Sequence, residues 1–154
     1  LEQRGELDQL TDALFWFNFA QVVASLLMLK MARFWVGRKS PLIIVLILCL
    51  LGAVGAVLMP GLFGIISATF MSFTAGLLLI LMVAVPPLLV SAAETGRLSA
   101  GNFLVGYTIA FIVPMIGGLV SDASGDIRHA FWVIIAYGVL VLPIAFSLKL
   151  ERSS

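Results

Sequence analysis

Three uncharged polar side chains, Asn18, Gln21 and Ser25, recur at three- and four-residue spacing in an otherwise apolar stretch. This spacing predicts that they share one face of a helix. Their amide and hydroxyl groups can donate and accept hydrogen bonds, which suits a polar solute in a water-filled cavity. The same groups can equally form hydrogen bonds between helices. Both alternatives require the face to point inward.

A second set of residues with a regular spacing is small rather than polar. Gly64, Ala68, Ser72 and Gly76 are four residues apart, and such a stripe allows another helix backbone to come close. Tight packing is therefore the favoured interpretation. The alternative is that Ser72, with the neighbouring Thr69, lines a cavity.

A third set lies between residues 102 and 120. Asn102 and Tyr107 are candidates for a solute pathway, because each carries a hydrogen-bonding group in an apolar stretch. The same stretch contains residues that favour a kink, and a helix that bends there can act as a gate. These gating candidates are Gly106, Pro114, Gly117 and Gly118.

Enzyme, metal and nucleic-acid chemistry find little support in the residue types. The only histidine, His129, lies in a short connection with Ser124 and Asp126, which suits a turn before a helix better than a catalytic cleft. The only cysteine, Cys49, excludes an internal disulfide and a CxxC metal motif. A net charge of +1 offers little to a nucleic acid. We expect no enzyme activity, no cofactor and no nucleic-acid partner.

The elements that carry these residues follow from the composition. The chain is 62% hydrophobic and 11% charged, and every charged residue lies outside five apolar stretches. At about 1.5 Å per residue, each stretch spans roughly the 30 Å bilayer core as a helix, which satisfies its own backbone hydrogen bonds in lipid. The sequence predicts an all-α polytopic membrane helix bundle, with spans at residues 13–29, 41–59, 61–85, 102–120 and 130–148.

The breaks between spans predict how the helices pack. Each connection is short and rich in Gly, Pro or Asp, so consecutive helices are expected to be antiparallel neighbours. Gly52 and Gly55 are expected to pack against another helix. The spans at 41–59 and 130–148 are almost uniformly apolar and are expected to be peripheral.

The basic residues predict an orientation, because Lys and Arg gather on the cytoplasmic side of a membrane. One side of the predicted bundle contains only Arg4 and Arg128. Residues 1–12 are therefore expected to form a polar extracytoplasmic segment, residues 13–150 the transmembrane bundle, and residues 151–154 a cytoplasmic tail. The other side contains seven basic residues, which are Lys30, Arg33, Arg38, Lys39, Arg97, Lys149 and Arg152.

Several of these residues match a known pattern. Gly37-Arg38-Lys39 resembles the end of a basic loop motif of the major facilitator superfamily, although Phe34 and Trp35 stand where that motif has Asp and Arg. The segment from Glu94 and Arg97 through Gly106-Tyr107 to Pro114-x-x-Gly117-Gly118 resembles the tenth-to-eleventh loop and eleventh helix of the same family. The order is most similar to the cyanate and nitroimidazole permease branch.

This resemblance implies that the chain is the C-terminal part, helices eight to twelve, of a twelve-helix transporter. It implies part of a secondary active transporter for a small organic or inorganic solute, working by alternating access in the bacterial inner membrane. The seventh helix or the N-terminal half would complete the bundle. The alternative is a non-transporting membrane subunit or an inactive truncated remnant. A transporter predicts polar faces that converge on one concave side, whereas the alternative predicts polar faces buried pairwise between helices.

Overall fold

The computed structural model describes residues 10–126 and 128–148, and within them every regular element is an α-helix. The predicted all-α bundle is therefore confirmed. The described part of the chain contains five long helices and one single-turn helix. Their bounds are α1 Leu10–Trp35, α2 Lys39–Leu58, α3 Gly61–Val83, α4 Pro86–Leu89, α5 Ala92–Ser124 and α6 Arg128–Ser147.

Five of these helices, all but α4, are long and apolar enough to cross a membrane. Their outer surfaces are also apolar: Leu104, Tyr107 and Phe111 of α5 each expose about 70% of their area. A soluble protein rarely exposes apolar patches of this extent. The chain is an integral membrane protein, with lipid as the solvent for these surfaces.

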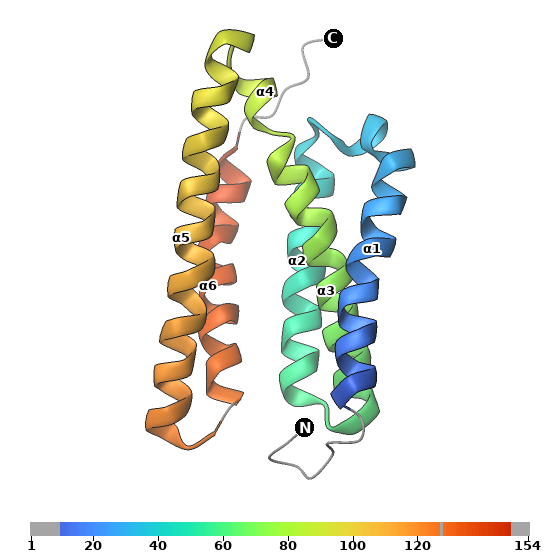
Figure 1. The fold of residues 1–154 in the computed structure, drawn as a ribbon, viewed down its shortest axis with the longest axis vertical. Helices are drawn as coiled ribbons and strands as arrows, with labels where there is room; N and C mark the ends of the chain where they lie inside the picture. The colour runs from blue at the N-terminus through green and yellow to red at the C-terminus, as the bar shows by residue number, and fades with distance from the viewer. Residues whose placement is uncertain (1–9, 127, 149–154) are drawn as a thin grey trace.

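The five long helices form an open row rather than a closed bundle (Figure 1). α1 packs along α3, α3 along α2, α2 along α6, and α6 along α5. The prediction that all consecutive helices are neighbours is correct for α2 with α3 and for α5 with α6. It is wrong for α1 with α2 and for α3 with α5, because α3 offers α1 a closer fit than α2 does.

Small residues on α3 explain that fit. A Cβ placed on Gly76 would lie 3.2 Å from the Cβ of Ala24 on α1, so the two backbones approach as closely as these small residues allow. One turn away, the buried Ser72 hydroxyl donates a 2.6 Å hydrogen bond to the Phe17 carbonyl. The packing role predicted for the stripe holds for its Ser72–Gly76 half.

α2 lies in the middle of the row, so the prediction that residues 41–59 are peripheral is wrong. A Cβ on Gly52 would lie 3.0 Å from the backbone nitrogen of Met71, and one on Gly55 would lie 2.7 Å from the Ser67 hydroxyl. The predicted packing role of Gly52 and Gly55 is thereby confirmed. The uniform apolarity of α2 reflects contact with a helix on each side rather than with lipid all round.

Contact between α2 and α6 uses another glycine. Gly138 of α6 leaves room for the side chain of Leu50, which a Cβ there would displace. Further along the same contact, buried Ala145 packs with Leu42 and Leu46 of α2. The core therefore consists of separate clusters: one joins α1, α2 and α3, and two join α2 and α6 with residues of or next to α3.

Helix α5 is much longer than its predicted span, because it begins at Ala92 rather than at residue 102. Ser91 precedes it, and the Ser91 hydroxyl donates a 2.8 Å hydrogen bond to the Glu94 carboxylate. This Ser-x-x-Glu pattern is typical of a helix start. Apolarity marks the part of a helix that crosses lipid, but the helix itself can continue beyond it.

Three glycines among the described residues adopt left-handed backbone conformations: Gly61, with a φ of +58° at the start of α3, and two at the ends of helices. Gly37 has a φ of +79° after the end of α1, and Gly125 has a φ of +69° after α5. Residues with a Cβ rarely adopt this conformation. These positions reverse the chain between antiparallel helices.

The described charges separate between the two ends of the row, as the orientation argument requires. Lys30, Arg33, Arg38, Lys39 and Arg97 lie at the end that carries α4, and Arg128 lies at the other end (Figure 1). Three residues of the predicted count, Arg4, Lys149 and Arg152, fall outside the described residues. So do residues 1–9 of the predicted N-terminal segment and the tail at 151–154.

The close contact at Gly52 makes a prediction about stability. Gly52→Ala should lower the unfolding free energy by about 1 to 3 kcal/mol, because the added methyl group would press against the backbone of Met71. Gly101→Ala on α5 is the matched control, since no atom lies within 4 Å of a Cβ there. Circular dichroism during denaturant titration in detergent micelles measures both. Equal stability of the two variants would contradict this packing.

Candidate functional site

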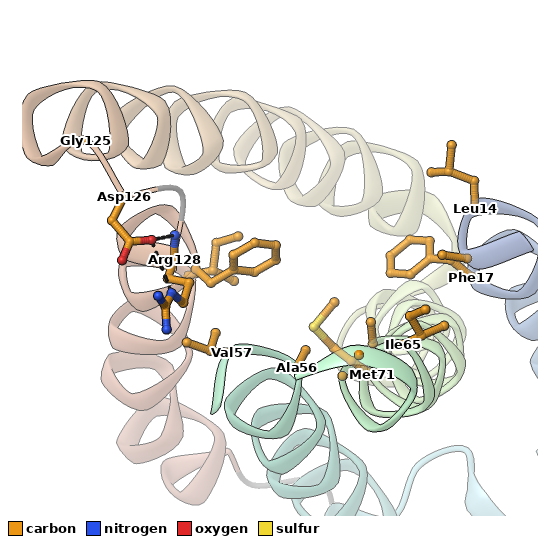
Figure 2. A pocket seen from close by; sticks show the side chains of 15 residues that line it. Leu14, Phe17, Ala56, Val57, Ile65, Met71, Gly125, Asp126 and Arg128 are labelled. Atoms are coloured by element: carbon orange, nitrogen blue, oxygen red, sulfur yellow. Dashed lines mark hydrogen bonds and ion pairs between the residues drawn. The ribbon is translucent and has the colours of Figure 1, made fainter. Parts of the chain in front are cut away.

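A hollow lies on one side of the row, between α1 and the α5–α6 connection (Figure 2). Its volume is about 770 Å³. α2 and α3 form its floor. The residues that line it are Ala13, Leu14, Phe17, Ala56, Val57, Gly61, Gly64, Ile65, Ala68, Met71, Gly125, Asp126, Arg128, Phe131 and Ile134.

The walls of this groove are mostly apolar, and part of the wall carries only small residues. Gly64 and Ala68, the other half of the small-residue stripe, face the groove together with Ala56 of α2. Phe17 reaches in from α1, as Figure 2 shows. At Gly64 the absence of a side chain is required by close packing, since a Cβ there would clash with the Met59 carbonyl.

Charged groups occur only at the end of the groove near the α5–α6 connection. The Asp126 carboxylate accepts hydrogen bonds from the Arg128 backbone N–H at 2.9 Å and from the Arg128 Nε at 3.3 Å. These bonds lower the pKa of the Asp126 carboxyl from its ordinary value, the backbone bond most of all. Nearby, the His129 Nδ1 lies 2.7 Å from the Ser124 hydroxyl. Together these contacts stabilise the turn that leads into α6. A turn before a helix is what the sequence predicted for His129, Ser124 and Asp126.

None of the predicted solute-pathway residues lines this groove, whose α1 wall is formed by Ala13, Leu14 and Phe17. Leu14 lines the groove, and Asn18, Gln21 and Ser25 follow it at four-, three- and four-residue spacing, on the same side of the helix. All three are exposed. The Asn18 amide donates to the Leu14 carbonyl at 2.7 Å, and the Ser25 hydroxyl donates to the Gln21 carbonyl at 3.0 Å. Their hydrogen bonds stay within α1, so pairwise bonding to another helix does not account for this face.

The two candidates on α3 lie elsewhere. Ser72 is fully buried between α1 and α3 and does not line the groove. Thr69 lines a second, smaller hollow of about 540 Å³, whose other walls are apolar side chains of α1 and α3, including Trp16 and Phe73. Thr69 and the α1 polar face therefore belong to different surfaces.

Candidates on α5 are exposed and lie outside both hollows. Asn102 and Tyr107 are exposed, and the Tyr107 ring stacks on Phe103 with centroids 6.1 Å apart. α5 remains helical through Pro114. Gly117 packs against α6, since a Cβ there would lie 3.0 Å from the Ala130 carbonyl.

The other two predicted gating residues of α5 have no close neighbours. A Cβ on Gly106 or Gly118 would meet no atom within 4 Å. Of the four gating candidates, Gly117 is therefore the one with an observed packing role.

Residues of the predicted loop motifs lie at the basic end of the row. Gly37 and Arg38 form the connection between α1 and α2, and Lys39 is the first residue of α2. Glu94 and Arg97 were expected in a loop, but both belong to the first turns of α5. The structure thus assigns Glu94 a role at a helix start through its bond with Ser91.

Sequence reasoning did not single out several residues that shape the groove. Phe17 and Met71 carried no signal, since each is one apolar residue among many. Asp126 was expected in a turn and Arg128 was counted only for the orientation, and both line the groove. The pattern Ser91-x-x-Glu94 could have been recognised as a helix start.

Comparison with known proteins gives no match, whether with protein-family models, curated proteins or solved structures. The residues of the chain and their arrangement are therefore the evidence for its function.

The Asp126 contacts predict a pH effect. Because folding lowers the pKa of this carboxyl, its contribution to stability is present above its ordinary pKa of 3.8 and is lost as the pH falls through the lower folded value. Carbon NMR of the carboxyl group in micelles should show titration below 3.8.

Asp126→Asn should abolish this part of the pH dependence of thermal unfolding. Asp122→Asn is the control, since the Asp122 carboxylate accepts no hydrogen bond within the described part of the chain, and it should retain the wild-type dependence. Titration of Asp126 at or above 3.8 would contradict the geometry.

Proposed function

We propose that this membrane protein is part of a secondary active transporter for a small organic or inorganic solute, working by alternating access. The observation that carries the proposal is the exposed polar face of α1, formed by Asn18, Gln21 and Ser25. The earlier resemblance to the last five helices of a major facilitator superfamily member agrees with it.

The amide groups on this face have donors and acceptors that form no hydrogen bond within the described residues. An Asn or Gln amide offers two N–H donors and an acceptor oxygen, yet within the described residues Asn18 forms one bond and the Gln21 side chain none. Leaving amide groups unpaired in hydrocarbon costs several kcal/mol. The face therefore needs water, a polar solute or another protein surface, and a transport pathway provides the first two.

The shape of the row supports a partner as well. α1 and α5 stand at its two ends, and the one buried residue of α5 is Gly117, which has no side chain. We propose that a seventh helix or an N-terminal half covers the open side and leaves a solute pathway beside α1. Such transporters bind solute between repeated halves near the membrane midplane.

Transport measurements test this proposal directly. Proteoliposomes that contain this chain extended upstream to its full reading frame should take up solute from a panel of small anions and neutral organic compounds, whereas this chain alone should not. Asn18→Ala and Gln21→Ala in the extended protein should each reduce kcat/KM by about tenfold, the effect of removing one hydrogen bond of about 1.5 kcal/mol.

A matched control separates loss of transport from loss of fold. Thr108→Ala removes a hydroxyl that bonds within its own helix, to the Leu104 carbonyl at 2.8 Å, and should leave uptake unchanged. Uptake that survives Asn18→Ala and Gln21→Ala together would refute the role of the α1 face.

For the orientation, we propose that the basic end and the C-terminus face the cytoplasm of a bacterial cell. In a Cys49→Ser background, Ser40→Cys places a thiol beside the basic connection, and Ser124→Cys places one at the opposite end. A membrane-impermeant maleimide added to intact spheroplasts should label position 124 and leave position 40 unlabelled until lysis. The reverse pattern would invert the topology.

A non-transporting membrane subunit is the second candidate, favoured by the exposure of α5 along nearly its whole length. Such a face suits another membrane protein. This alternative predicts no uptake by the extended chain for any solute in the panel, together with a stable complex that survives detergent extraction.

A further inference from the structure

Charge is distributed very unevenly between the two ends of the helix row. Among the described residues, the end that carries α4 has one acidic residue, Glu94, against five basic ones, a net of +4. The opposite end has Arg128 against three acidic residues, a net of −2 with neutral histidine. The basic residues are Lys30, Arg33, Arg38, Lys39 and Arg97.

Four of the five basic residues are concentrated in one short segment that crosses the membrane surface. The apolar run of α1 ends at Leu29, Lys30 follows directly, and α2 begins at Lys39. The six residues that follow Leu29, up to Trp35, rise by about 9 Å, which roughly matches the headgroup layer on one side of a bilayer. The segment therefore lies at the depth of lipid phosphate groups.

Aromatic residues hold this segment at that depth. The Arg33 guanidinium lies over the Phe34 ring, 4.4 Å from its centroid. Trp35 is half-buried against the cluster that contains Met28 and Val45. Aromatic rings favour the membrane interface. They therefore hold the backbone that carries the basic side chains at the level of the headgroups.

Among the described residues, no acidic side chain forms an ion pair with Lys30, Arg38 or Lys39. The ion pair that this part of the chain does form joins Arg128 to Asp126 at the opposite end. Glu94, the acidic residue at the basic end, receives its hydrogen bond from Ser91. Lys30 and Arg38 are exposed, and Lys39 is half-buried.

We propose that this segment binds the phosphate headgroups of anionic phospholipids, with Lys30, Arg38 and Lys39 as the contacting residues. Clusters of Lys and Arg next to a membrane helix attract anionic lipids by about 1 kcal/mol per residue. The surrounding bilayer holds lipid phosphate groups at the depth of these side chains. A soluble anion is not held at that depth. The binding does not depend on transport.

Tryptophan quenching provides a local test, because Trp35 lies at the basic end while Trp16 and Trp132 lie at the other end. A variant that keeps only Trp35 is reconstituted in phosphatidylcholine bilayers that contain brominated phosphatidylglycerol or, for comparison, brominated phosphatidylcholine. Trp35 should be quenched preferentially by the anionic lipid, and this preference should weaken as salt is added. A variant that keeps only Trp16 should show no such preference.

Charge substitutions identify the residues responsible. Arg38→Gln should lower the preference of the Trp35 site for phosphatidylglycerol about fivefold, and adding Lys39→Gln should lower it further by a similar factor. The charge-preserving exchange Arg38→Lys with Lys39→Arg is the matched control and should retain the preference. A preference that survives Arg38→Gln with Lys39→Gln, equal quenching by both lipids, or displacement by inorganic phosphate at constant ionic strength would each overturn the proposal.

Discussion

Close approach of helix backbones along α3 is the constraint on which the arrangement depends. In lipid, apolar side chains gain little by leaving the solvent, so helices associate through van der Waals contact and a few hydrogen bonds. Gly76 lets α1 come near on one side of α3, and Gly52 of α2 lets α3 come near on the other. The buried Ser72 bond to the Phe17 carbonyl adds one polar contact to the first pair. α3 can therefore hold two neighbours at once, and this organises the row.

The sequence was sufficient to predict the number of spans and their helical character. Those features depend on apolar length and on the need to satisfy backbone groups in lipid, which are local properties. The packing glycines Gly52 and Gly55 were also recognisable, because small residues within an apolar run have few other uses. The predicted role of the Ser72–Gly76 half of the stripe follows from the same reasoning.

Neighbour relations and helix ends were less predictable. α2 is uniformly apolar, and contact with lipid or with two helices would produce the same composition, so its central place could not be inferred. The start of α5 was missed since a charged turn outside the membrane contributes nothing to apolar length. Of the candidate site, the shared face of Asn18, Gln21 and Ser25 followed from periodicity. The exposure of this face did not, because it depends on which side of α1 packs against α3.

The two ends of the row meet different physical requirements. Near the α5–α6 connection, charges are paired with each other, as in the Asp126–Arg128 contact, and they fix a turn. At the basic end, Lys30, Arg38 and Lys39 form no ion pair within the described residues, and their charge must be balanced by the surroundings. Between the ends, the unfilled hydrogen-bonding capacity of α1 also has to be met from outside the row. The polar groups of α1 and of the basic end thus require partners outside the row. The contacts within the row are almost entirely apolar.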